Sequence, residues 1–153
     1  MKILSIPNEN GKMTCFWEEG ASSGKKPLII CLADKEEDAQ RDLNLLFSQA
    51  NGASVAALVV YPQTEEQIVG DWLYSLRQRE DVDENRITLT GTLSAADWVW
   101  RLGSHFPQWF AGICAVGGYG DPYEVRAMKN VPVRAYLVEE EPQIIRKGKV
   151  AVN

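Results

Sequence analysis

The chain lacks the features that would assign it to several common classes of protein. Its three cysteines, Cys15, Cys31 and Cys114, are an odd number without Cys-x-x-Cys spacing. They predict neither a disulfide framework nor a metal site, and we expect buried thiols in a reducing compartment. No apolar run approaches the roughly 20 residues of a transmembrane helix, and the apolar start is interrupted at Pro7, too early for a signal peptide. We therefore expect a cytoplasmic protein that makes no membrane contact.

Clustered positive charge is also missing. The 153 residues carry a formal net charge of −5, and their Lys and Arg residues are scattered along the chain. A nucleic acid or an anionic membrane surface would need a basic patch or stripe. We therefore expect no nucleic-acid partner.

What the sequence does contain is an alternation of strand and helix patterns. Segments 2–7 and 12–18 flank a turn cluster and predict an N-terminal β-hairpin. Continuous apolar runs, typical of strands covered on both faces, then alternate with amphipathic helices. The predicted strands are 27–33, 54–61, 87–90, 110–116, 132–138 and a short one at 149–152, and the predicted helices are 36–50, 65–78 and 95–106, with a polar connector at 81–85. This order predicts one α/β domain over residues 1–153, a three-layer α/β/α sandwich around a mostly parallel sheet.

Residues 86–100 predict a buried strand that runs through a tight turn directly into a helix. Branched and apolar residues alternate over 87–90, and Gly91 permits a close approach of the backbone. A strand that enters a helix in this way is the framework of a nucleophile elbow, Gly-x-Ser-x-Gly. The five residues from Gly91 are Gly-Thr-Leu-Ser-Ala. The central residue is therefore Leu93, which has no nucleophilic atom.

Several motifs in one order resemble a known family. They are Val-Asp-Glu-Asn-Arg-Ile-Thr-Leu-Thr-Gly at 82–91, His-Phe-Pro-Gln-Trp-Phe-Ala-Gly-Ile at 105–113, Gly-Gly-Tyr-Gly-Asp-Pro-Tyr at 117–123 and Lys-Asn-Val-Pro-Val at 129–133. Together they resemble the α/β-hydrolase fold, in particular the esterase and predicted-peptidase group related to polyhydroxybutyrate depolymerases and dienelactone hydrolases. The resemblance runs from about residue 25 to residue 142. It implies a serine hydrolase with a Ser, Asp, His triad and a backbone oxyanion hole.

The same resemblance places each part of the triad on this chain. The family's Thr-Gly-Leu-Ser-Met-Gly-Gly segment aligns without a gap on residues 90–96, so Leu93 takes the place of the serine and Ala95 and Ala96 replace two glycines. Glu141, just before a proline, takes the place of the aspartate. The catalytic histidine has no counterpart before the chain stops at Asn153. The sequence's one histidine, His105, is expected at the far end of the helix, in a structural role.

The loop that would supply an oxyanion-hole amide also departs from the family. The expected His-Gly-Gly sequence is replaced at 32–37 by Leu-Ala-Asp-Lys-Glu-Glu. No glycine is present to bring backbone N–H groups onto a substrate, and three carboxylates would oppose a developing oxyanion.

Ser94 is the remaining candidate nucleophile. Small residues two positions before and after it satisfy the motif only if the strand is one residue longer, and that slip would reverse which face each strand side chain occupies. We interpret Ser94 instead as the N-cap of the helix, its hydroxyl accepting from the N–H of Ala96 or Asp97.

Two further segments are weaker candidates for ligand binding. Acidic residues at 34–38 and at 139–141 are both predicted near the carboxyl ends of parallel strands, where a divalent cation could bind. We interpret both as solvated acidic surface and expect no metal or cofactor. Residues 117–120, Gly-Gly-Tyr-Gly, lack the Lys-Ser/Thr of a phosphate-binding loop and predict a turn.

The sequence thus predicts an α/β-hydrolase-like protein that is catalytically inactive and acts as a binding or interaction module. Two alternatives stay open: a weak serine esterase or peptidase that uses Ser94 with a base from elsewhere, and a binder of a small ligand or divalent cation at the acidic edge. The strand at 132–138 is expected to leave a free sheet edge. We therefore also expect a homodimer, or another protein partner, at that edge.

Overall fold

The computed structural model describes residues 1–8, 11–117 and 131–136. In these ranges the strands and helices follow one another in the predicted alternation. The elements are β1 (Lys2–Asn8), β2 (Gly11–Glu18), β3 (Lys26–Ala33), α1 (Glu36–Phe47), β4 (Ser54–Val59), α2 (Glu66–Arg77), β5 (Val82–Thr92), α3 (Ser94–His105), the 3₁₀ turn η1 (Pro107–Trp109), β6 (Gly112–Val116) and β7 (Val133–Tyr136).

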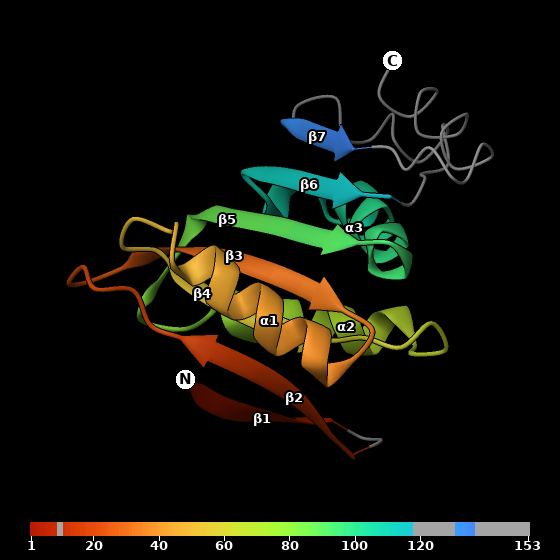
Figure 1. The fold of residues 1–153 in the computed structure, drawn as a ribbon, viewed down its shortest axis with the longest axis horizontal. Coiled ribbons are helices and arrows are strands. Elements are labelled where there is room, and N and C mark those ends of the chain that lie inside the picture. The colour runs from red at the N-terminus through yellow and green to blue at the C-terminus, as the bar shows by residue number, and fades with distance from the viewer. Residues whose placement is uncertain (9–10, 118–130, 137–153) are drawn as a thin grey trace.

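All the described strands form one sheet, in the order β1-β2-β4-β3-β5-β6-β7 (Figure 1). The hairpin β1–β2 joins β4 in antiparallel pairing. The neighbours β4–β3, β3–β5, β5–β6 and β6–β7 are all parallel. The predicted mostly parallel sheet with an N-terminal hairpin is therefore confirmed.

Helices cover both faces of this sheet. Helix α1 lies in front of β3 and β4 in Figure 1, and α2 lies behind them. On the α1 face, Ala39 and Leu43 pack with Phe16, Val55 and Ala57. The larger core on the other face joins buried side chains of the sheet to those of α2 and α3. Its members include Trp17, Leu28, Ile30, Leu32, Leu58, Trp72, Leu73, Trp98, Val99 and Trp100. The three layers are those that the sequence predicts.

The central strand is longer than the sequence indicates. Residues 81–85 were expected to be a polar connector, but β5 already begins at Val82. Val82 is buried and pairs with Lys26, and a shift in register separates this pair from the pair Leu28 and Ile87. The predicted connector is therefore wrong at Val82, which is buried and already pairs with Lys26, and the polar residues 83–86 form the irregularity that follows this pair.

The cysteines are free thiols. Cys15 and Cys31 are buried, and burial raises the pKa of each thiol to about 12. Such groups behave as small apolar side chains at neutral pH. No helix in the described part of the chain is long and apolar enough to cross a membrane.

Candidate functional site

A single residue forms the turn between the central strand and its helix. Strand β5 ends at Thr92 and α3 begins at Ser94, so Leu93 alone connects them. Its backbone has φ 54° and ψ −122°, a region that non-glycine residues rarely adopt. Its side chain is 59% exposed. The turn therefore presents the side chain of residue 93 to solvent on a strained backbone, as a nucleophile elbow does.

Contacts from the neighbouring strand hold the backbone of Leu93. Its N–H donates to the carbonyl of Val116, the last residue of β6, over 2.6 Å. Gly117 follows with φ 92°, and a Cβ there would lie 3.2 Å from the Cα and Cδ2 of Leu93. The close approach of these two segments fixes the position of the turn.

The packing of α3 against the turn determines where small residues are required. A Cβ on Gly91 would lie 2.9 Å from Cγ2 of Val99 and 3.0 Å from the carbonyl oxygen of Ala95. Position 91 therefore needs glycine. Ala95 and Ala96, at the positions where the resemblance places two glycines, are buried in the core between the sheet and α3. The structure thus accommodates a methyl group at each of these two positions.

Ser94 does not occupy the predicted capping position. The N-cap of α3 is Leu93, and no side chain caps the helix there. Ser94 is the first helical residue, so the predicted N-cap is wrong by one position. The cause is the positive φ at Leu93, which reverses the chain within one residue and allows the helix to begin at once.

The strand β3 ends beside this turn and forms a small hollow with it. The hollow has a volume of 160 Å³ and is lined by Ala33, Asp34, Lys35, Asp38, Arg41, Thr92 and Leu93. Arg41 lies 3.2 Å from Asp38 and 3.4 Å from Asp42, so its charge is already engaged. The carboxylates and the cations that line the hollow are balanced in number. The sequence predicted that three carboxylates would surround a developing oxyanion at this loop. The hollow instead carries both signs of charge, and Glu36 and Glu37 do not line it.

The other residues predicted for a triad lie apart from the turn or outside the described residues. His105 is the last residue of α3, roughly 18 Å along the helix from Leu93 at 1.5 Å per residue. Its Nδ1 lies 2.7 Å from Oε1 of Glu66. Glu141 and the acidic run at 139–141 lie outside the described residues, as does the glycine-rich stretch from 118. Their predicted roles stay predictions.

Within the described ranges, no group of three or more His, Cys, Asp or Glu side chains is arranged to hold a metal ion. The acidic residues that follow β3 diverge instead. Asp34 and Asp38 line the hollow beside Leu93, whereas Glu36 faces a different cavity.

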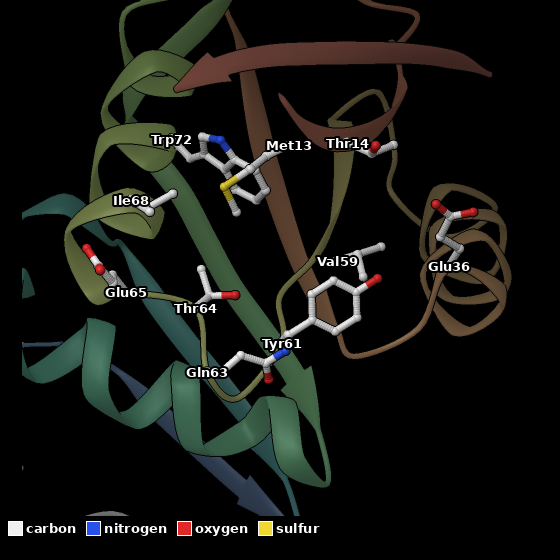
Figure 2. Close-up of a pocket in the computed structure, with 10 residues that line it drawn as sticks. All are labelled: Met13, Thr14, Glu36, Val59, Tyr61, Gln63, Thr64, Glu65, Ile68 and Trp72. Carbon is white, nitrogen blue, oxygen red and sulfur yellow. The ribbon is translucent and has the colours of Figure 1, made fainter. Parts of the chain in front are cut away.

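That second cavity has a volume of 420 Å³ and shares no lining residue with the first. Figure 2 shows it between β2, the end of β4, α2 and the start of α1. It is lined by Met13, Thr14, Glu36, Val59, Tyr61, Gln63, Thr64, Glu65, Ile68 and Trp72. The sequence patterns did not predict it. The one available signal was the exposed aromatic and polar segment 61–65 that follows a buried strand, at the edge where parallel α/β sheets bind ligands.

The sheet order, the layers and the strained strand–helix turn together define an α/β-hydrolase fold, and comparison with solved structures supports this class. A thermostable esterase superposes with a TM-score of 0.81 at 17% identity, over 99% of this chain and 50% of that one. The enterochelin esterase from Shigella flexneri gives 0.68 at 14% identity, over 97% and 48%. A Klebsiella pneumoniae protein described as a dienelactone hydrolase gives 0.61 at 16% identity, over 91% and 85%.

At these identities the likeness shows the fold alone. The chain spans about half the length of the two esterases that it matches. No protein-family profile and no curated protein sequence matches it.

Proposed function

We propose that this chain is a binding protein built on an α/β-hydrolase fold and that it does not hydrolyse esters or amides. The observation that carries the proposal is Leu93, a leucine on the φ 54°, ψ −122° turn between β5 and α3. In a nucleophile elbow this is the position from which the attacking oxygen or sulfur is presented. A leucine side chain offers carbon and hydrogen only, so no covalent intermediate can form on it.

The surroundings of the turn support the same proposal. An oxyanion hole needs backbone N–H groups, or other fixed donors, aimed at the developing charge. The loop after β3 brings Asp34 and Lys35 to this hollow, and helix α1 brings Asp38 and Arg41. Arg41 is paired with Asp38, so the positive charge beside the turn is partly neutralised.

The position of His105 also supports the proposal. A general base must come within about 3 Å of the proton that it removes, directly or through one water. His105 is held at the opposite end of α3 by Glu66. It is the one histidine in the sequence.

The second candidate function is a weak serine hydrolase that uses Ser94. Esterases are among the structures that share this fold, which favours the alternative. Ser94 follows the strained turn directly. This function would also need a base, and the described lining of the hollow beside the turn contains no histidine.

Turnover of p-nitrophenyl acetate and butyrate tests the two functions. The wild-type chain is compared with Ser94→Ala and Leu93→Ala, and an active serine esterase serves as the positive control. We expect all three proteins to match the buffer rate. The weak hydrolase would be established instead if the wild-type chain exceeded the buffer rate, Ser94→Ala lost this turnover and Leu93→Ala kept it.

We also propose a cytoplasmic location. The free thiols of Cys15, Cys31 and Cys114 support it, because such thiols persist in reducing compartments.

A further inference from the structure

We propose that the 420 Å³ cavity between β2, β4, α1 and α2 binds a small organic cation, an amine or quaternary ammonium compound with an apolar or aromatic body. The proposal does not depend on the absence of hydrolysis. The hollow beside Leu93 and this cavity have no lining residue in common, so each can be tested without the other.

The size and the floor of the cavity suit a compact apolar group. Cavities that bind small molecules are typically about 300–1,000 Å³ and mostly apolar. Trp72 and Val59 are buried at the bottom, and Met13 and Ile68 are half-buried beside them. A ring or a branched alkyl chain would find apolar contacts on several sides here.

The rim of the cavity is polar, and its charged residues are both negative. Thr14, Gln63, Thr64 and Tyr61 bring hydroxyl and amide groups to the opening, and Glu36 and Glu65 are the charged residues. Figure 2 shows the two glutamates on opposite sides of the cavity, with Tyr61 between them. The described lining contains no Lys, Arg or His. A cationic head would therefore meet attraction from two sides, and an anion would meet repulsion.

An aromatic ring at the opening adds a second reason to prefer a cation. Tyr61 is 49% exposed and lies two residues past Val59, the buried end of β4. A cation over a tyrosine face is attracted by the ring's quadrupole. The chain's net charge of −5 favours approach of the same ligands.

Strands and helices hold the apolar residues of the cavity. Ile68 and Trp72 are four residues apart on α2, so they lie on one helical face. Strand β2 is paired with β4 next to the cavity, through Cys15 and Leu58. The polar residues of segment 61–65 lie in the loop between β4 and α2. The apolar body of a ligand would therefore meet a preformed surface.

Calorimetric titration with three matched ligands tests the proposal. Phenethylamine, 2-phenylethanol and phenylacetate share an aromatic ring and differ in charge at neutral pH. We expect phenethylamine to bind at least about tenfold more tightly than the alcohol, and phenylacetate to bind more weakly still. Equal affinities for all three, or no binding of phenethylamine at millimolar concentration, would overturn the proposal.

Two exposed glutamates that are neighbours on α1 provide a matched pair of variants. Glu36 lines the cavity and Glu37 does not. We expect Glu36→Gln to weaken phenethylamine binding about five- to tenfold at low salt, and Glu37→Gln to weaken it less than about twofold. Equal losses in the two variants would show a general electrostatic effect and contradict a site at Glu36.

A cavity-filling variant locates the ligand. Thr64 is half-buried at the rim, and Thr64→Phe would place a ring in the space. We expect this variant to lose binding of both phenethylamine and the alcohol while circular dichroism shows the wild-type fold. Unchanged binding would place the ligand elsewhere and overturn the proposal.

Discussion

Leu93 combines an unfavourable backbone with little burial. A residue held in such a sparsely populated region of φ and ψ costs about 1–3 kcal/mol. An exposed leucine recovers little of that cost through apolar contacts. The hydrogen bond to Val116 and the close approach of Gly117 hold the turn in place. These backbone contacts, and not the leucine side chain, impose the strained conformation. Other non-glycine residues at position 93 would therefore be strained in the same way.

Relief of this strain gives a first prediction. We expect Leu93→Gly to leave the free energy of unfolding unchanged or to raise it by up to about 1 kcal/mol, because the relieved strain offsets the entropy cost of glycine. Leu45 in α1 is equally exposed but helical. Leu45→Gly should therefore cost about 1 kcal/mol in the same urea titration. If Leu93→Gly costs as much, the turn is not strained.

Gly91 gives a second prediction. A methyl group there would collide with Val99 and with the carbonyl of Ala95, so we expect Gly91→Ala to lower the free energy of unfolding by about 1–3 kcal/mol. Gly112 on β6 has room for a Cβ, whose nearest neighbour would be 3.5 Å away. Gly112→Ala should change stability by less than about 0.5 kcal/mol. Equal effects in urea denaturation would contradict the close packing of α3 on β5.

At the scale of elements, an ion pair marks the start of β5. Both carboxylate oxygens of Asp81 lie 3.0 Å from nitrogens of Arg79. The Asp81 carbonyl accepts from the N–H of Lys26, the first residue of β3. Arg79 also lies over the ring of Trp17, 4.5 Å from its centroid. This short segment therefore connects β2, β3 and β5 at one end of the sheet.

The ion pair gives a third prediction, one that depends on pH. The hydrogen bonds from the Arg79 guanidinium lower the pKa of the Asp81 carboxyl in the folded chain. The stabilisation from this ion pair is therefore present above the pKa of the unfolded state and is lost as pH falls through the lower pKa of the folded state. We expect Asp81→Asn to cost about 0.5–1 kcal/mol at pH 7 and to make stability fall less steeply between roughly pH 5 and pH 2. Asp71→Asn, at an exposed position on α2, should change neither quantity. An unchanged acid profile in Asp81→Asn would contradict the pairing.

The sequence predicts the described elements well where apolar periodicity is strong. Helix α1 and strands β3 and β4 begin within one residue of their predicted starts, because buried apolar runs determine them. The start of β5 was missed, since Val82 is followed by four polar or charged residues. The N-cap at Ser94 was misplaced because propensity assumes an ordinary helix start, and a positive φ at Leu93 has no signature in a leucine.

At the scale of the whole molecule, the two hollows differ in how far the sequence predicts them. Leu93 sits on one continuous strand–turn–helix segment, so local spacing is enough to find it. The larger cavity combines side chains from β2, α1, the end of β4 and α2, which are far apart in the chain. Only the sheet order brings them together, because β2 pairs with β4 rather than with β3. Periodicity within one segment carries no such information.

The sheet edge gives a fourth prediction. Among the described strands, β7 pairs with β6 and has no second neighbour. An unpaired edge of a parallel sheet offers backbone donors and acceptors to another chain. We propose that a second copy of the chain pairs with this edge, and we expect a mass of about twice 17.1 kDa in light scattering. A monomer at every accessible concentration would contradict it.

We propose that residue 93 occupies the nucleophile position of this fold without nucleophilic chemistry, and a fluorophosphonate probe tests this central claim most directly. Intact-mass analysis after incubation would compare the folded wild-type chain with Ser94→Ala, and an active serine esterase would show that the probe is competent. We predict no added mass on either form of this chain. Stoichiometric labelling that Ser94→Ala abolishes would contradict the claim and make the protein a serine hydrolase.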